Sequence, residues 1–483
     1  MKNINEHFKF LNGNELENIN LEDQEIDLEL KNLFYMIFPN LVSFAKHLSL
    51  HESIYHYDKK TYKRFFKNKE ILNTVYTYKI FNKRSFPLYN KDYLKHSLKS
   101  ILKMSYFTLL KNLPNNHNID INESRLCFYK PNALSLVANK WKFYEKLKIN
   151  NYNNFEYLFE NSKFEINNEL YELIILKFSD FFKDDFYFNI FKRISYKFVK
   201  IIYFVDFIAS NYLEYPKAEK IIFGSESQLL TKIIRHKLIS KDYKVYTYEH
   251  GCRSFLFKND FFFTKYNRLF FSTNYFITGI GQKIISSKDK EIKNKIILSK
   301  SYEPKIKNIL NKSQRFKNNK KILYILEMNN NNFVHEPHNI SFKFQENIIK
   351  YLINFFNINN LFFKLKKHPD STINSFSEFI INGDLIDLYN EFDIILFDHT
   401  LSTAFCEALN SNKKIIILDF NQNNFEDNFS LIVNKRCHRI STTINNDLSI
   451  DLDEEFLKEC IFKNNKIDEE IIHNTKNFFR PEI

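Results

Sequence analysis

The stretch "FDIILFDHTLSTAFCEALNSNKKIIILDF" (392–420) decides the expected fold, because it joins two short apolar runs through one helical segment. Residues 392–400 and 413–420 are rich in Ile, Leu and Phe, which is typical of buried strands. Residues 401–411 between them have the composition of a short helix. Short apolar strands that alternate with helices predict a parallel, doubly wound sheet.

The same alternation continues on both sides of this stretch. Upstream, the expected strands and turns are 220–227, 244–251, 274–281 and 295–298, with a helix at 228–240. Later, strands are expected at 321–328 and 361–370, with a helix at 344–359. The polar, basic segment 299–321 between the two series reads as a linker. The sequence therefore predicts an α/β protein with two Rossmann-like halves, whose ligand site lies in a cleft between the carboxyl ends of both sheets.

These boundaries divide the chain into four regions. We expect a helix-rich, basic N-terminal region at 1–130 and a Rossmann-like acceptor domain at 131–305. A Rossmann-like domain for a donor nucleotide follows at 316–450, and C-terminal helices at 451–483.

The bulk composition excludes several classes of protein. With 483 residues, of which 44% are hydrophobic, the chain is long enough for two or three domains and is not intrinsically disordered. No stretch reaches 18 uncharged apolar residues, and the N-terminus lacks the apolar core of a secretory signal. The five cysteines form no CxxC pair, which argues for a reducing compartment and against disulfides or structural zinc: Cys127, Cys252, Cys406, Cys437 and Cys460.

The net charge of +13 comes largely from residues 59–111, which hold 14 lysines and arginines and only two acidic residues. Lys91, Lys95, Lys99 and Lys103 recur every four residues, as on one stripe of a helix. Such a stripe is either a solvated face of a helix packed on the core or a surface for anionic lipid or a polyanionic acceptor. No nucleic-acid-binding signature accompanies the charge, so we do not expect nucleic acid as a partner.

Glycine is scarce, with six residues in the chain, and its placement is therefore informative. Gly224, Gly251, Gly279 and Gly281 each follow a short apolar run, where a strand must turn sharply. We expect Gly224 and Gly251 to be structural turn residues and Gly279 to lie at the donor site.

Two titratable residues end the strand "KVYTYEHG" (244–251), namely Glu249 and His250. A carboxylate or an imidazole at the end of a strand can take a proton from an acceptor hydroxyl. Glu249 could equally form a surface ion pair, and His250 could hydrogen-bond within the turn. Both are candidate catalytic residues.

In the second half, "KLKKHPD" (364–370) places His368 at the end of a strand, where Pro369 stops the hydrogen-bond ladder. A histidine there can contact a phosphate oxygen, although a lone His-Pro pair is common.

Hydroxyl side chains follow the strand that ends at Asp398. Thr400, Ser402 and Thr403 lie at the opening of a helix, where hydroxyls and free N–H groups can bind an anion. Ser and Thr are also the preferred helix caps, so an ordinary N-cap explains them equally well. Glu407, one turn further on, could reach a ribose or sugar hydroxyl or simply be exposed.

The sequence gives little support for a metal site. The one DxD pattern, Asp451-Leu452-Asp453, runs into "EEFLKE" and reads as the start of a helix. His335 and His338 in "VHEPH" flank a proline without an acidic framework, so donor contact is the more plausible role for this segment. We expect no metal and no other cofactor.

Taken in order, "FGSES", "YEHG", "ITGIG", "KLKKHP" and "DHTLSTAFCEAL" resemble the His-Pro-containing GT-B glycosyltransferases of bacterial surface-polysaccharide synthesis. Sialyltransferases and Kdo-transferases belong to this group, and the CDP-glycerol glycerophosphotransferases are also similar. The resemblance covers roughly residues 200–420. It implies two Rossmann-like domains that face each other across a cleft.

The resemblance also implies roles for individual residues. In the sialyltransferase-like families an acid before a glycine is the general base, which corresponds to Glu249 and Gly251, although His250 departs from the pattern. In the glycerophosphotransferase-like group the base is the histidine of a His-Gly pair, which corresponds to His250. The donor phosphate would be bound by His368, Ser402 and Thr403.

Together these features lead to one main functional expectation. The chain would be an inverting, metal-independent glycosyltransferase of capsule or lipopolysaccharide synthesis, with CMP-sialic acid or CMP-Kdo as the favoured donor and a glycan or lipid-linked glycan as acceptor. A glycerophosphotransferase and a non-catalytic protein that binds anionic lipid or polyanion are the alternatives. We expect a cytoplasmic protein that associates with the inner face of the membrane through residues 59–111.

Overall fold

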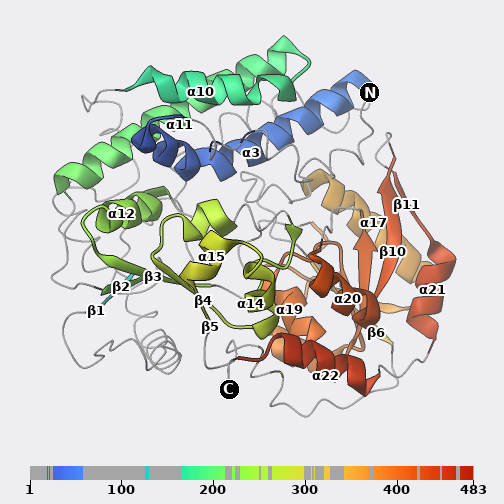
Figure 1. Ribbon diagram of the computed structural model, residues 1–483. Helices are drawn as coiled ribbons and strands as arrows, with labels where there is room; N and C mark the ends of the chain where they lie inside the picture. Colours follow the sequence, from blue (N-terminus) through green and yellow to red (C-terminus); the bar gives the residue numbers. More distant parts are fainter. Residues whose placement is uncertain are drawn as a thin grey trace, which may run out of the picture.

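The computed structural model contains two β-sheets beside each other and a layer of helices over the first of them (Figure 1). It describes residues 25–57, 126–129, 166–212, 220–223, 229–249, 252–258, 264–298, 320–326, 342–368, 375–420, 425–445, 449–463 and 468–481, and the single residues 19, 21, 306, 309 and 371.

The first sheet has five parallel strands in the order β1-β2-β3-β4-β5. They are β1 (Leu126–Tyr129), β2 (Lys220–Phe223), β3 (Lys244–Tyr248), β4 (Asn274–Ile277) and β5 (Ile296–Leu298). Parallel neighbours need a crossover, and most of the links contain helices: α12 (Leu229–Ile239), the π-helix η4 (Lys265–Leu269), α14 (Ile280–Ser286) and α15 (Lys290–Lys295). Because every strand runs in the same direction, all carboxyl ends lie at one edge of the sheet.

The second sheet has six strands in the order β11-β10-β9-β8-β6-β7. The parallel strands are β6 (Lys321–Ile325), β7 (Phe362–Lys366), β8 (Ile394–Phe397), β9 (Lys414–Asp419) and β10 (Cys437–Ile444), and β11 (Ile450–Leu452) pairs antiparallel at the edge. The helices of this half are α17 (Phe342–Ile358), α18 (Leu385–Glu391), α19 (Thr403–Leu409), α20 (Asp427–Arg436) and α21 (Glu454–Phe462).

The strand order of the second sheet reverses at β6. The chain first winds outward from β6 to β7 and then returns to β8 on the other side of β6. Ligands of open α/β sheets bind outside the carboxyl ends of the strands at such a reversal. The carboxyl ends of β6 and β8 therefore mark the expected ligand position.

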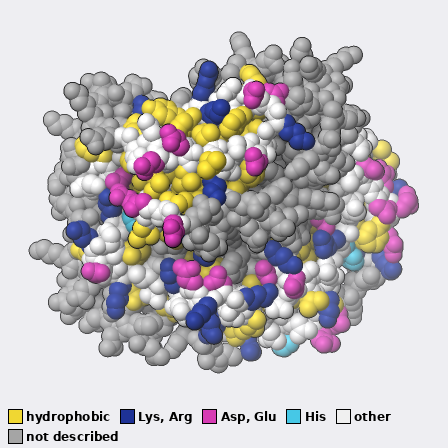
Figure 2. Space-filling model, turned by 45° about the horizontal axis from the view of Figure 1, so that its top comes forward, with side chains coloured by type: hydrophobic (Ala, Val, Ile, Leu, Met, Phe, Trp, Pro, Cys, Tyr) yellow, Lys and Arg dark blue, Asp and Glu magenta, His cyan; other side chains and the backbone are white. Residues whose placement is uncertain are grey.

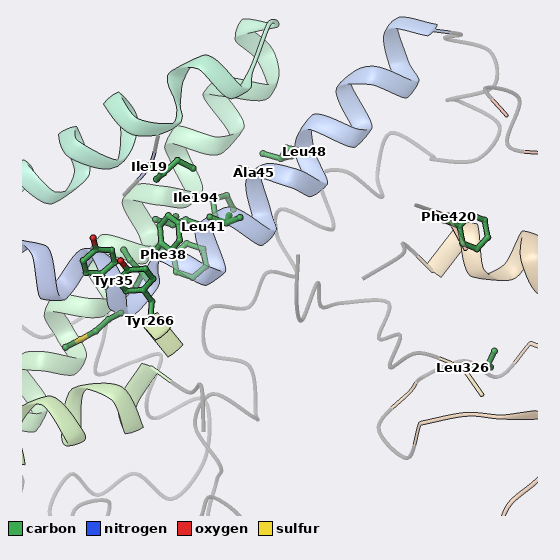
Figure 3. Close-up of a cluster of buried hydrophobic side chains, with 14 of the residues drawn as sticks. Ile19, Tyr35, Phe38, Leu41, Ala45, Leu48, Ile194, Tyr266, Leu326 and Phe420 are labelled. Carbon is green, nitrogen blue, oxygen red and sulfur yellow. The ribbon is translucent and has the colours of Figure 1, made fainter. Parts of the chain in front are cut away.

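A helical layer covers the first sheet (Figure 1). It consists of α3 (Leu28–Tyr57), α10 (Asn168–Phe178), the 3₁₀ turn η3 (Ser179–Phe181) and α11 (Asp185–Tyr212). Figure 3 shows Tyr35 and Phe38 of α3 directed towards Tyr266 of η4, and the rings of Tyr35 and Tyr266 stack with centroids 4.0 Å apart. The apolar face of α3 thus joins the layer to the first sheet.

The outer face of this layer is partly apolar. Leu176, Phe186 and Tyr196 are exposed there, and Figure 2 shows hydrophobic side chains gathered with both acidic and basic side chains around them. None of the described helices is long and apolar enough to cross a membrane.

The C-terminal helix α22 (Glu469–Phe478) returns from the second half to the first. The N–H of Ile280 donates to the carbonyl of Arg480 at 2.9 Å, and a Cβ on Gly281 would lie only 2.1 Å from the ring of Phe478. Only a residue without a side chain at 281 permits this close approach of α14 and α22.

One apolar core spans both halves of the molecule. It contains Phe257, Ile277 and Ile285 from the first half together with Phe405, Phe429 and other residues from the second. Phe257 and Phe425 also form an isolated antiparallel β-bridge. The two sheets are therefore packed against each other as one body.

These features confirm the predicted fold class: an α/β protein with two sheets of parallel strands and a helix-rich N-terminal region. The strands and helices expected between 220 and 420 occur within a few residues of their predicted ends. Asp453 caps α21 as expected, but Asp451 and Leu452 belong to β11 rather than to a helix. Residues 59–111 lie outside the described residues, and the four-region division stays a prediction.

Candidate active site

The segment that follows β3 and the segment that follows β8 meet in space. The Nη1 of Arg253 donates to the carbonyl of Leu401 at 3.1 Å, and the Sγ of Cys406 lies 3.6 Å from the carbonyl of Cys252. These contacts join positions about 150 residues apart in the chain. The predicted base region of the first half thus lies against the loop that was predicted to bind the donor phosphate.

Glu249 lies directly after β3 and is buried, with 4% of its surface exposed. Its Oε1 accepts hydrogen bonds from the N–H and the hydroxyl of Thr278, at 3.0 and 2.9 Å. Its Oε2 accepts from the Nε2 of Gln282 at 2.9 Å and from the N–H of Ser254 at 3.4 Å. The carboxylate therefore ties together the ends of β3 and β4, α14 and the loop that follows.

Two opposing effects act on the pKa of Glu249. Burial raises the pKa above its ordinary value, because a carboxylate loses solvation in a low-dielectric interior. The hydrogen bonds from Gln282, Thr278 and Ser254 lower it again, since they favour the charged form. The net result is a raised pKa, which suits a proton acceptor. When the carboxylate takes up a proton, however, its hydrogen bonds from Gln282, Thr278 and Ser254 must rearrange.

The loop 252–256 is held firmly beside Glu249. Cys252 and Phe255 have φ angles of 54° and 68°, in the left-handed region that bulky residues rarely adopt. Such a backbone persists only where the surroundings determine it. Here Ser254 is buried, and its hydroxyl lies 3.0 Å from the Tyr275 hydroxyl and accepts from Nη1 of Arg268 at 3.1 Å.

At the carboxyl end of β8, Asp398 is buried and forms a polar cluster with two other side chains. The hydroxyl of Tyr324, on β6, donates to its Oδ2, and the Nε2 of Gln345, on α17, lies 3.4 Å from the same oxygen. Burial raises the pKa of Asp398 from 3.8 to about 6, although the bonds from Tyr324 and Gln345 lower it. This cluster fixes β6, α17 and β8 to one another at the point where the strand order reverses.

The loop after Asp398 is compact. The N–H of Ser402 donates to the carbonyl of Thr400 at 2.8 Å, and the Nε2 of His399 lies 3.0 Å from the carbonyl of Leu401. Thr400 is buried, whereas Ser402 and Thr403 are partly exposed. The Ser402 hydroxyl accepts from the N–H of Phe405 at 3.1 Å, so this residue is the N-cap of α19, and its O–H can still donate to a ligand.

Glu407 lies on the inner side of α19 and is 1% exposed. Its charge contributes to the raised pKa of Tyr389, whose own burial is the larger cause. A side chain this deeply buried does not reach a bound ligand without a rearrangement of α19.

His368 is exposed two residues after β7. Neighbouring strands lie about 4.8 Å apart. Since β7 and β8 flank β6, the ends of these two strands are separated by about 10 Å. His368 and Ser402 therefore follow strands whose carboxyl ends lie at the same edge of the second sheet.

Gly279 is the N-cap of α14, and a Cβ there would lie 3.1 Å from the Phe478 carbonyl. The described contacts of Gly279 are with Gln282 of α14, whose Oε1 accepts from its N–H at 3.0 Å, and with α22, and its donor-binding role stays a prediction. The remaining predicted site and turn residues lie outside the described residues: Gly224, His250, Gly251, His335, His338 and Pro369.

Sequence reasoning missed several polar residues of the site. No distinguishing pattern surrounds Arg253, His399, Tyr324 or Gln345, although Arg253 lies two residues after the "YEHG" motif. No group of three or more His, Cys, Asp or Glu side chains with metal-site geometry occurs among the residues that the structure describes.

Comparisons with known proteins identify distant structural neighbours. No protein-family model matches the chain, and no curated protein matches its sequence. The UDP-GlcNAc 2-epimerase from Methanocaldococcus jannaschii, solved with UDP-GlcNAc and UDP, is 14% identical, with a TM-score of 0.33, over 56% of this chain and 77% of that one. A putative UDP-N-acetylglucosamine 2-epimerase from Listeria monocytogenes is 11% identical, with a TM-score of 0.33, over 59% and 76%.

The glycosyltransferase SnogD from Streptomyces nogalater is 9% identical, with a TM-score of 0.31, over 73% of this chain and 94% of that one. Similarity at this level of identity and TM-score does not indicate an activity for this chain. Function must therefore be inferred from the site and from the motifs.

Proposed function

We propose that this chain is an inverting glycosyltransferase of the GT-B type, which transfers a sugar from a nucleotide-activated donor to a glycan acceptor. The observation that carries the proposal is the contact between Arg253 and Leu401. It brings the candidate base region after β3 to the hydroxyl-bearing loop after β8. Such a transfer requires a base and phosphate-binding groups that lie close together.

In the proposed reaction the acceptor hydroxyl attacks the anomeric carbon while the bond to the donor phosphate breaks. Ser402 and Thr403, whose side chains are partly exposed, would donate hydrogen bonds to the departing phosphate, and His368 would contact it from the end of β7. Donors that are already positioned stabilise developing negative charge without reorganisation. We propose that these side chains supply that stabilisation without a metal.

Glu249 and His250 both remain candidates for the base. The hydrogen bonds that Glu249 accepts from three residues favour a positioning role for it, because each bond must be replaced before the carboxylate can move. That observation gives weight to the second candidate function, a CDP-glycerol-type glycerophosphotransferase with His250 as the base. Incubation with CMP-sugars and with CDP-glycerol separates the two, since the nucleotide product is CMP in both cases but only one donor is consumed.

More specifically, we propose that the enzyme acts in capsule or lipopolysaccharide synthesis and uses CMP-sialic acid or CMP-Kdo as its donor. It depends on the motif resemblance and on the order of the site segments. A thermal-shift screen with CMP, CDP, UDP and GDP tests it. A ligand that binds only the folded state at about 100 times its Kd stabilises the protein by about 2.7 kcal/mol, which is a readily measured rise in Tm.

The screen needs two variants. His368→Ala should lose the nucleotide-dependent rise in Tm, whereas His473→Ala should keep it, because His473 is exposed on α22. A wild-type protein whose Tm responds to none of the four nucleotides would overturn the proposed function.

We also propose that residues 59–111 bring the enzyme to an anionic membrane surface on the cytoplasmic side, where a lipid-linked acceptor would lie. The 14 basic residues of this segment support the proposal, since each basic residue near such a surface contributes about 1 kcal/mol. Replacing Lys91, Lys95, Lys99 and Lys103 by glutamate should abolish sedimentation with phosphatidylglycerol vesicles. Undiminished sedimentation of that variant would refute the assignment. Vesicle binding without any transferase activity would instead support the non-catalytic alternative.

A further inference from the structure

Arg253 is the one partly exposed residue in a buried loop. Cys252, Ser254, Phe255 and Leu256 around it are all fully buried. The burial of its neighbours fixes the backbone from which the side chain of Arg253 extends. Its position at the meeting point of the two halves makes it a candidate for contact with a ligand in the cleft.

The loop holds Arg253 in place through its neighbours. The N–H of Ser254 donates to Glu249, the carbonyl of Ser254 accepts from Nε2 of Gln282 at 3.0 Å, and its hydroxyl accepts from Arg268. With the left-handed backbone at Cys252, these bonds order the loop before any ligand arrives. A preorganised group loses less entropy on binding than a mobile surface arginine does.

The guanidinium is directed at the loop after β8. Its Nη1 lies 3.1 Å from the carbonyl of Leu401, and the Nε2 of His399 lies 3.0 Å from the same oxygen. The next residues, Ser402 and Thr403, are those proposed to contact the donor phosphate.

We propose that Arg253 is a catalytic residue that contacts the phosphate of the nucleotide donor from the side of the first sheet. A guanidinium matches phosphate geometry and remains charged at any working pH. In the transfer, the bond between the anomeric carbon and the phosphate oxygen breaks and its electron pair stays on that oxygen. The acceptor oxygen forms the new bond and gives its proton to the base, and Arg253 stabilises the charge that accumulates on the phosphate. This inference rests on the proposed function.

The test compares ligands that differ only by the phosphate. Titration calorimetry measures the affinity of wild-type protein, Arg253→Gln and Arg253→Lys for cytidine, CMP and CDP. Arg193→Gln serves as the matched control, since Arg193 is exposed on α11. We expect Arg253→Gln to weaken binding of CMP and CDP by about tenfold to a hundredfold and to leave cytidine unchanged, because hydrogen bonds to charged groups are the stronger ones. Arg253→Lys should recover part of the loss, and the control should match the wild type.

The outcomes separate this inference from the proposed function. Binding of CMP and CDP by wild-type protein, together with equal binding by Arg253→Gln, would overturn the role of Arg253 and leave the proposed function standing. If the wild type binds none of these ligands, the comparison is repeated with the nucleoside and nucleotides of whichever base raises Tm, and both proposals fail if neither UDP nor GDP raises it. A role that is only structural would weaken cytidine binding as much as CMP binding, and that result also overturns the inference. Thermal unfolding of each variant checks folding, and Arg253→Lys gives the readout if the glutamine variant unfolds.

Discussion

The buried carboxylate of Asp398 makes the stability of the protein depend on pH in a defined window. Burial raises its pKa from 3.8 to about 6 in the folded state, whereas the unfolded chain has the ordinary value. Each pKa unit corresponds to 1.36 kcal/mol, so the difference amounts to about 3 kcal/mol. Because the folded state binds the proton more tightly, this contribution is fully present below pH 4 and is lost as pH rises towards 6.

The substitution Asp398→Asn removes this dependence, because an amide is neutral at every pH. The difference in Tm between Asp398→Asn and wild type should therefore increase in favour of the variant between pH 4 and pH 6 and stay constant above about pH 7. A free-energy change of 1 kcal/mol shifts Tm by about 2–4 °C in domains of 150–250 residues, so the increase is at most about 12 °C.

Differential scanning fluorimetry at constant ionic strength from pH 4 to pH 8 measures this difference. Asp242→Asn is the matched control, because Asp242 is exposed and its φ of 61° suits asparagine. Its curve should run parallel to that of the wild type. A parallel curve for Asp398→Asn as well would show that Asp398 has an ordinary pKa, and the buried cluster at the end of β8 would be refuted.

Two further predictions concern packing and burial. Gly281→Ala should lower the free energy of unfolding by about 1–3 kcal/mol, because its Cβ would lie 2.1 Å from the ring of Phe478. This penalty should vanish in a Phe478→Ala background. An equal penalty in both backgrounds would contradict the contact between α14 and α22. Burial raises the pKa of Cys437 to about 12. Iodoacetamide at pH 8 should therefore modify this thiol far more slowly in the native protein than in the unfolded chain, and peptide mass spectrometry measures both rates. Equal rates would show that the thiol is exposed.

The sequence predicted the parallel strands well because a strand that is buried on both faces consists of consecutive apolar residues. The runs 394–397 and 414–419 are nearly all Ile, Leu and Phe, and both faces of these strands are buried. In contrast, β10 reads "CHRISTTI", with buried and exposed residues in an irregular order, and no strand was predicted there. The three residues of β11 are too few for any periodicity to be read.

The site was predictable at its strand ends and not in its contacts. Apolar runs that stop at Glu249 and Asp398 indicate where the strands end, and hence the edge at which a ligand binds. The burial of Glu249 depends on Thr278 and Gln282, about 30 residues away, so the sequence could not distinguish a surface ion pair from a buried network. Arg253 is recognisable only through Leu401, 148 residues further on.

The most direct test of this account is a crystal structure of the protein with a bound CMP-sugar or with CMP. The account predicts the phosphate within hydrogen-bonding distance of Ser402 or Thr403 and of Arg253, at the carboxyl ends of β6 and β8. A nucleotide bound elsewhere, with the loops 252–256 and 398–402 making no contact to it, would contradict the central claim.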